Sequence, residues 1–224
     1  MMNKKETVLG ITMGNNKGNL FGSENDAILF YNLFYSFYLK EYNDIVWLEP
    51  KILLNKQVTI NNLLNLIDNT SINKLIIYFS GHGYRKRLKF FDENIINDKF
   101  FNSINQKIKN IDEIILILDC CYSGSFFIDK KYAKINNIKY LTACNKNQKC
   151  NEGLVNFNKE NFIHKNPQKI NKLNNIIIGI FSYNLFKLLK NKNMYNPNKW
   201  LSTKKSIIWT QIEKLAKQTF TIFS

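Results

Sequence analysis

The chain has 224 residues, 45% of them hydrophobic, so it can bury a sizeable core and fits one domain over residues 1–224. Its formal net charge is +15, but the positive charge is spread along the chain without a recognisable nucleic-acid-binding motif, and we expect no nucleic-acid partner. No apolar run is long enough to span a membrane, and the four cysteines lack CxxC spacing, so we expect a cytoplasmic, reducing setting and no membrane association.

The first strand is predicted over residues 8–13, so close to the start that we expect no pro-domain. A polar loop follows, and Ser23 with Asp26 three residues later fits the capping box that begins a helix. On the residues alone, a capping role is the favoured interpretation of Asp26. The helix expected behind it, over 27–39, is apolar almost all round, which predicts deep burial.

A second strand is expected over 44–48 and a short helix over 59–66. The apolar run from Leu75 to Phe79 then predicts a buried strand, which ends in Ser80-Gly81-His82-Gly83. A histidine therefore lies at the mouth of this strand, between two glycines that let the backbone turn sharply.

A second buried strand is predicted from Ile114 to Leu118, followed by Asp119-Cys120-Cys121-Tyr122-Ser123-Gly124-Ser125. Between the two strands, residues 98–108 carry apolar side chains at helical spacing. Strand, helix and strand form a βαβ unit with parallel strands. If the strands are neighbours, His82 and Cys121 emerge at the carboxyl edge, where open α/β sheets bind ligands.

Alternation along the strands separates the two adjacent cysteines. Cys121 shares a face with Asp119, whereas Cys120 points the other way, into packing. We therefore predict Cys121 as a nucleophile, because a nearby imidazole, that of His82, favours the thiolate and later protonates a leaving amine. The alternative is structural, since a cysteine at a strand end and a histidine in a glycine-rich turn each occur without catalysis.

The two blocks around His82 and Cys121 resemble the signature blocks of the metacaspases, caspase-fold cysteine peptidases that cleave after Arg or Lys. The resemblance extends to three further blocks in the same order, namely residues 20–27, 141–148 and 179–185. It implies a three-layer α/β sandwich with a mostly parallel sheet of about six strands flanked by helices. It also implies two halves, over about 1–130 and 135–224, and a monomer.

The resemblance also implies a set of site residues. His82 would act as general acid and base, and the backbone amides of Gly83 and Cys121 would form the oxyanion hole. Asp26 and Asp119 would bind the basic side chain of a protein or peptide substrate, and the neighbouring pocket positions are Ser23 and Ser80.

No cofactor is required for this chemistry, although the resemblance implies that calcium could activate the chain. Calcium prefers six to eight oxygen ligands, and the acidic insertion that supplies them in metacaspases is missing. The remaining acidic residues near the site are Asp92, Glu93, Asp98 and Asp129. We therefore expect no strong metal site and weak calcium dependence.

The basic cluster at 84–89 is expected to be a solvated turn, although a self-cleavage site also fits it. Residues 127–137 are expected to link the halves, and a strand is predicted at 138–143. The polar segment 150–175, which contains His164, is expected to be a flexible loop. The last elements are expected at 176–178, 182–190 and 207–215.

Two alternative functions remain open. The missing calcium acids and a C-terminal end that looks trimmed leave room for a caspase-fold scaffold that binds proteins without turnover. The net charge leaves room, less strongly, for a nucleic-acid binder.

Overall fold

The computed structural model describes residues 5–67, 71–107, 111–126, 138–156, 175–191, 194–197 and 221–223. The strands are β1 (Glu6–Gly14), β2 (Ile45–Trp47), β3 (Lys51–Leu54), β4 (Lys74–Ser80), β5 (Gly83–Tyr84), β6 (Arg87–Lys89), β7 (Asn94–Ile96), β8 (Glu113–Asp119), β9 (Ile138–Thr142), β10 (Glu152–Asn156), β11 (Asn175–Gly179) and β12 (Thr221–Phe223). The helices are α1 (Ser23–Tyr38), a 3-10 turn at Asn55–Gln57, α2 (Ile60–Ile67), α3 (Asn97–Lys107) and α4 (Ile180–Asn191).

The central sheet has the strand order β12-β9-β8-β4-β1-β2, with β3 also paired to β1. β2 pairs with the first part of β1 and β3 with the last part, so these two short strands share one edge of a sheet six positions wide. Every neighbouring pair is parallel except β9 and β12. This confirms the predicted, mostly parallel sheet of about six strands.

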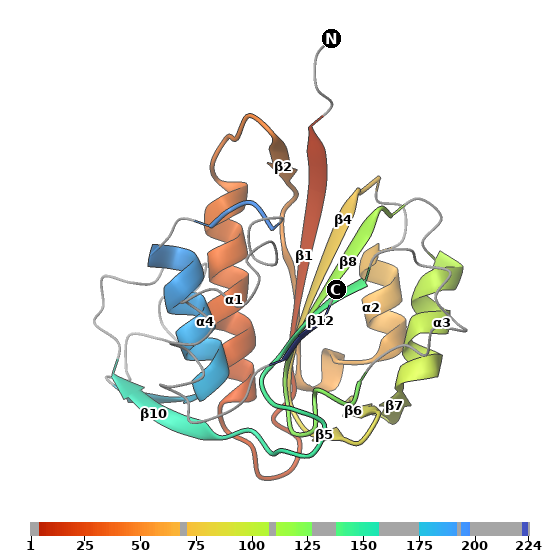
Figure 1. Cartoon of the computed structure of the whole chain (residues 1–224), viewed down its shortest axis with the longest axis vertical. Helices are drawn as coiled ribbons and strands as arrows, with labels where there is room; N and C mark the ends of the chain where they lie inside the picture. The colour runs from red at the N-terminus through yellow and green to blue at the C-terminus, as the bar shows by residue number, and fades with distance from the viewer. Residues whose placement is uncertain are drawn as a thin grey trace.

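Helices cover both faces of the sheet. Figure 1 shows α1 and α4 on one face and α2 and α3 on the other, which gives the three-layer α/β sandwich expected from the sequence. None of the helices in the described part of the chain is both long enough and apolar enough to cross a membrane. Two small antiparallel sheets, β10-β11 and β5-β6-β7, lie outside the central one.

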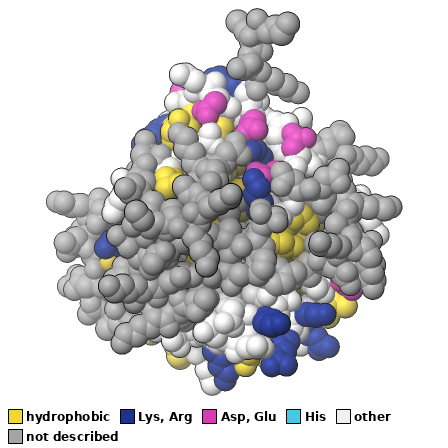
Figure 2. All heavy atoms as spheres, viewed as in Figure 1, with side chains coloured by type: hydrophobic (Ala, Val, Ile, Leu, Met, Phe, Trp, Pro, Cys, Tyr) yellow, Lys and Arg dark blue, Asp and Glu magenta, His cyan; other side chains and the backbone are white. Residues whose placement is uncertain are grey.

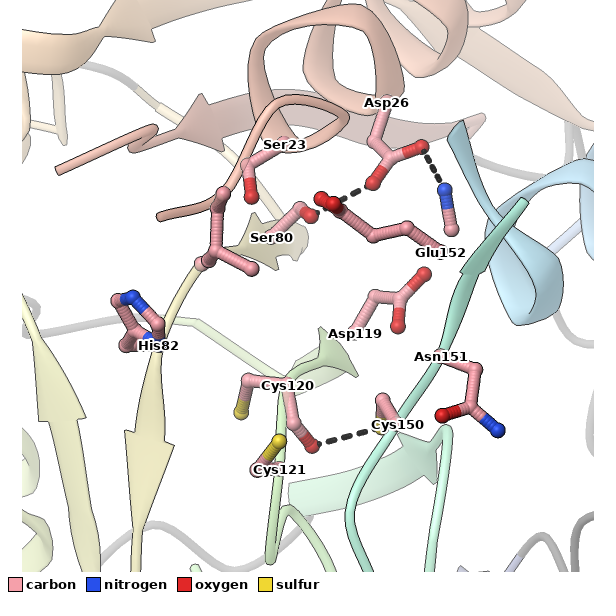
Figure 3. A pocket seen from close by; sticks show the side chains of 13 residues that line it. Ser23, Asp26, Ser80, His82, Asp119, Cys120, Cys121, Cys150, Asn151 and Glu152 are labelled. Carbon is pink, nitrogen blue, oxygen red and sulfur yellow. Dashed lines mark hydrogen bonds between the residues drawn. The ribbon is translucent and has the colours of Figure 1, made fainter. Parts of the chain in front are cut away.

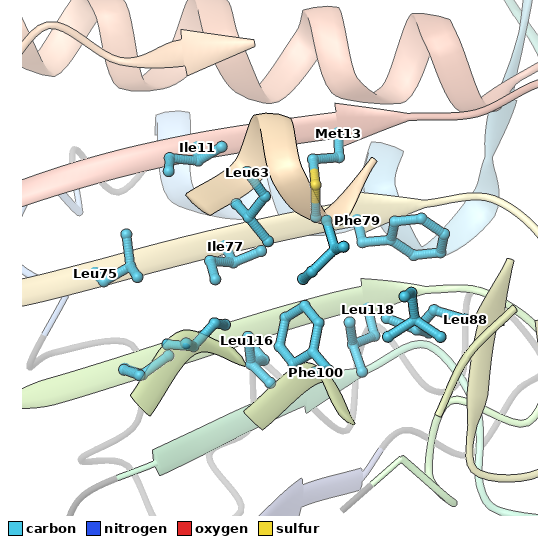
Figure 4. Close-up of a cluster of buried hydrophobic side chains, with 14 of the residues drawn as sticks. Ile11, Met13, Leu63, Leu75, Ile77, Phe79, Leu88, Phe100, Leu116 and Leu118 are labelled. Carbon is cyan, nitrogen blue, oxygen red and sulfur yellow. The ribbon is translucent and has the colours of Figure 1, made fainter. Parts of the chain in front are cut away.

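Two hydrophobic cores lie on opposite faces of the two central strands, β4 and β8, which are buried along their whole length. Alternate residues such as Ile77 and Phe79 face α2 and α3, where they pack with Phe100 (Figure 4). The residues between them, such as Ile76 and Tyr78, pack with α1 and α4. This alternation continues past the end of β8, because Cys120 belongs to the same core as Phe79.

The start of α1 corrects one prediction. Ser23 is the first helical residue, Gly22 takes the N-cap position, and no side chain caps the helix from there. The N–H groups at this end are bonded from outside: Asn16 accepts from Glu24 at 3.1 Å, and Glu152 accepts from Gly22 at 2.8 Å. Because these partners are already in place, the capping box is not formed, and Asp26 is left for another role.

The segment after residue 150 also differs from expectation. It begins with β10, which pairs antiparallel with β11 across five residue pairs, so its first part is a strand and not a loop. The basic cluster at 84–89 lies in the hairpin of β5 and β6 and is therefore more than a solvated turn. His164, the linker at 127–137 and the helix predicted at 207–215 lie outside the described residues.

Candidate active site

A pocket opens at the carboxyl edge of the sheet, where β1, β4 and β8 end side by side. The register pairs Gly14 with Ser80 and Ser80 with Asp119. A Cβ on Gly14 would lie 2.3 Å from the carbonyl oxygen of Ser23, so only glycine lets the first turn of α1 pack over this edge. The pocket is lined by Leu20, Ser23, Asp26, Ser80, Gly81, His82, Asp119, Cys120, Cys121, Cys150, Asn151, Glu152 and Gly179 (Figure 3).

His82 and Cys121 both line this pocket, each two residues beyond the end of its strand. Cys121 is partly exposed, whereas Cys120 is 2% exposed and packs into the core. The structure thus places the two cysteines as strand alternation predicts. The hairpin after His82 approaches the nucleophile loop closely, because a Cβ on Gly83 would lie 2.2 Å from the carbonyl oxygen of Cys121.

The resting protonation states differ from the expected thiolate and imidazolium. Burial raises the pKa of Cys121, and a hydrogen bond from the backbone of Cys150 only partly offsets this. Burial and the nearby charge of Lys89 lower the pKa of His82. Within the described residues no hydrogen bond joins His82 to Cys121 (Figure 3). Both groups are therefore neutral near pH 7, and proton transfer between them needs the closer approach that substrate binding can bring.

The two candidate pocket aspartates are held by a buried network. Asp26, 1% exposed, accepts hydrogen bonds from the hydroxyl of Ser80 at 2.7 Å and from the backbone N–H of Gly179 at 2.8 Å (Figure 3). Asp119, 5% exposed, accepts from the N–H and the hydroxyl of Ser182 at the start of α4. The two aspartates are thus held by β11 and α4, which lie far along the chain. Gly179 comes 153 residues after Asp26, and Ser182 comes 63 residues after Asp119.

Burial also governs the charge of these aspartates. It raises the pKa of Asp119 to about 6. It raises the pKa of Asp26 well above the usual range, and repulsion by Asp119 raises it further. Two carboxylates that share one buried site do not ionise independently. Asp26 and Asp119 together therefore carry less than two full negative charges near neutral pH.

Ser80 and Ser23 are both buried and line the pocket, as expected. Ser80 has a defined task, because its hydroxyl orients the carboxylate of Asp26. The sequence reasoning missed Glu152 and Gly179. Glu152 adds a third carboxylate to the pocket, and a Cβ on Gly179 would lie 2.1 Å from a carboxylate oxygen of Asp119. Apolar alternation could not reveal Glu152, because it begins a strand in a polar segment.

The other two cysteines lie directly behind the nucleophile. The thiols of Cys144 and Cys150 both donate to the carbonyl oxygen of Cys120, at 3.3 and 3.0 Å. Hydrogen bonding by Cys150, partly offset by burial, lowers the pKa of Cys144 to about 7. All four cysteines are free thiols. Cys150 lines the pocket, whereas Cys144 is buried behind it and donates to the same carbonyl oxygen.

The part of the chain that the structure describes does not fit a calcium site. Among those residues, no group of three or more His, Cys, Asp or Glu side chains is arranged to hold a metal ion. Glu93, one of the acids considered, is engaged by Lys99 in an ion pair. No step of the chemistry is therefore assigned to a metal.

Comparison with known proteins identifies the family. The model of the peptidase C13 family matches residues 14–163, more than half of the chain, a stretch that includes His82, Cys121 and all three pocket carboxylates. No curated protein matches the chain. The C13 family contains legumain and the GPI transamidase and belongs to clan CD, so the match supports the caspase-like part of the sequence resemblance without supporting the metacaspase type. The chain belongs to the peptidase C13 family, and it is a caspase-like cysteine peptidase of clan CD.

Proposed function

We propose that this peptidase is an endopeptidase that cleaves after arginine and, less efficiently, after lysine, as the resemblance to metacaspases implies. The observation that carries the proposal is the charge of the pocket. Asp26, Asp119 and Glu152 line it, whereas no Lys or Arg is among the described residues that do so. Buried carboxylates without a cation are costly, so a cationic side chain is the ligand that this pocket stabilises best.

Arginine fits this pocket better than lysine. Its planar guanidinium carries five N–H donors and binds carboxylates in a bidentate way, whereas the lysine ammonium is a point charge. Asp26 and Asp119 are already oriented by Ser80, Gly179 and Ser182, so little ordering is required when the substrate enters. The cation would also ionise both aspartates, so we expect binding to release protons at mildly acidic pH.

The reaction follows from the groups at the pocket mouth. The Cys121 sulfur attacks the scissile carbonyl carbon while His82 accepts the thiol proton. His82 then donates this proton to the leaving amine, and a thioester to Cys121 remains. Water, deprotonated by His82, hydrolyses the thioester and regenerates the thiol. The backbone N–H groups of Gly83 and Cys121 are proposed to stabilise the oxyanion, and each donor in such a site contributes roughly 3 kcal/mol.

A second candidate is a scaffold that binds basic segments without cleaving them. The neutral state of His82 and Cys121 favours it, because burial raises the pKa of the thiol more than its neighbours lower it, and within the described residues no hydrogen bond joins it to His82. An arginyl chloromethylketone separates the two candidates. A peptidase is alkylated at Cys121, and the labelling requires His82, whereas a scaffold leaves the thiol unmodified.

Fluorogenic peptides that differ only at the cleaved residue test the specificity. With Arg, Lys, Asn and Asp at that position, we expect cleavage in the order Arg, then Lys, with essentially none after Asn or Asp. Cys121→Ala is the control for contaminating activity. Efficient cleavage after Asn or Asp with none after Arg would show that the carboxylates do not select the substrate.

A further inference from the structure

Five basic side chains surround the nucleophile loop on two sides. Arg85, Lys86 and Arg87 lie on the hairpin of β5 and β6, and Lys146 and Lys149 lie on the turn after β9. All five are exposed, and we call them the basic rim. Figure 2 shows Lys and Arg side chains gathered at the lower end of the molecule, where Figure 1 places β5 and β6.

Hydrogen bonds hold both segments of the rim against the loop of Cys121. The backbone N–H of Lys86 donates to the hydroxyl of Ser125 at 2.9 Å. On the other side, the N–H of Tyr122 donates to the carbonyl of Gln148 at 2.8 Å. The basic rim is therefore built onto the same loop that carries the nucleophile, at a fixed place relative to the pocket.

The hairpin has a residue that local preference does not explain. Lys86 has a φ of 60° in the two-residue turn between β5 and β6. Glycine and asparagine are strongly favoured in this left-handed conformation, and a lysine there costs conformational energy. The tip of the hairpin therefore carries a positive charge at a position where the backbone favours another residue.

The charges of the basic rim are not neutralised from within the described part of the protein. None of its five side chains forms an ion pair with a carboxylate of the described residues. The positive field also reaches the reacting groups. The charge of Lys149 lowers the pKa of Cys121, against the larger effect of burial, and Lys89 at the base of the hairpin lowers the pKa of His82.

We infer that the site takes polypeptide segments in which acidic residues flank the cleaved basic residue, an inference that rests on the proposed function. The acidic pocket selects one cation, and the surrounding basic rim attracts carboxylates on the same substrate chain. The two features have opposite charge and lie side by side, so the recognised pattern is a single basic residue in an acidic context. Runs of basic residues would instead be repelled by the rim.

Three peptides test this inference. Each peptide carries one Arg at the cleaved position and two identical residues on each side of it. The flanking residues are Glu in the first peptide, Gln in the second and Lys in the third. We expect kcat/KM at low salt to be about five- to tenfold higher for the Glu peptide than for the Gln peptide, the range that two exposed charge pairs produce. The Lys peptide should be the poorest substrate. The Glu preference should shrink as salt rises, because exposed charges are screened.

Variants locate the effect. Arg85→Gln combined with Arg87→Gln should lower the ratio of kcat/KM between the Glu and Gln peptides, while Lys86 keeps the turn as it is. The matched control is Lys40→Gln with Lys187→Gln, which removes the same charge from exposed residues at the C-terminal end of α1 and on α4. This control should preserve the ratio, since neither residue belongs to the basic rim.

The outcomes separate the two proposals. Equal kcat/KM for the Glu and Gln peptides, with Arg still required, would overturn the basic rim as a specificity element and leave the proposed function intact. An unchanged ratio in the Arg85 and Arg87 variant would do the same. Absence of cleavage in all three Arg peptides would overturn the proposed function and the inference together. Fluorescence anisotropy with Cys121→Ala gives the same comparison for binding alone.

Discussion

Replacing Asp119 with asparagine should stabilise the protein at neutral pH while abolishing its preference for arginine. Asp119 is only 5% exposed, and burial raises its pKa to about 6 from an ordinary value of 3.8. A carboxyl group with a raised pKa holds its proton more tightly in the folded state. Its contribution to stability is therefore complete below about pH 4 and is lost as pH rises through 6.

The size of this effect follows from the difference in pKa. About two pKa units correspond to a cost on the order of 3 kcal/mol for keeping Asp119 ionised in the folded protein above pH 7. Asparagine has nearly the same shape and retains a carbonyl oxygen for the hydrogen bonds from Ser182, but it carries no charge. Relative to the natural chain, Asp119→Asn should therefore gain up to about 3 kcal/mol at pH 7.5 and little or nothing at pH 4.5.

Urea denaturation of both chains at the two pH values measures this difference. Asp92→Asn, which removes an exposed carboxylate near β7, serves as the control and should show no comparable pH-dependent gain. The same Asp119→Asn protein should lose at least about 2 kcal/mol of discrimination in favour of arginine peptides, the scale of losing one partner of a buried charge pair. A stability difference that is equal at both pH values would show that burial does not control this carboxyl group.

Four further predictions concern the same site. Cys121→Ala should remove all detectable cleavage, whereas Cys120→Ala should keep most of it and lose about 1 kcal/mol of stability from a small cavity; the reverse result would refute the assignment by strand alternation. Gly179→Ala should abolish arginine cleavage, since its Cβ would lie 2.1 Å from Asp119, and circular dichroism separates this from unfolding. Because the pKa of Cys121 is raised, its alkylation by iodoacetamide should be slow at pH 7 and accelerate above pH 9; a fast, pH-independent rate would indicate a preformed thiolate. Calcium titrated from chelator to millimolar levels should change activity less than about tenfold, and a saturable rise beyond that would point to ligands outside the described residues.

The parts of the site that sequence could predict lie next to strong patterns. The buried apolar runs of β4 and β8 predict where each strand ends, and therefore where His82 and Cys121 lie. Because side chains alternate between the two faces of a strand, the pattern also predicts that Cys120 and Cys121 point in opposite directions. For Asp26 the local sequence favours a capping role, since a carboxylate in the first turn of a helix fits a capping box, and only the resemblance implies a role in the pocket. Only the tertiary partners from Asn16 and Glu152 decide between them.

The rest of the site depends on contacts that no local pattern encodes. β3 and the hairpin of β5 and β6 are two to four residues long, too short for periodicity to register. Glu152 begins a strand whose partner lies beyond a long polar segment, and the backbone of Gly179 meets Asp26 from 153 residues away. The contacts that Glu152 and Gly179 make in the pocket follow from the pairing of β10 with β11. The composition of the segment does not indicate this pairing.

The separate origins of the reacting groups and the pocket walls have a consequence for synthesis on the ribosome. Cys121 and His82 stand on strands that pair with each other, whereas Gly179 and Ser182, which hold the two aspartates, belong to a segment translated later. A nascent chain can therefore place the thiol and the imidazole at the carboxyl edge of the sheet before the substrate-selecting pocket is complete. In such a chain Asp26 and Asp119 lack the hydrogen bonds that Gly179 and Ser182 donate in the full chain. An inhibitor that must bind in the arginine pocket would thus label only completed chains. A simple thiol reagent would label completed and incomplete chains alike.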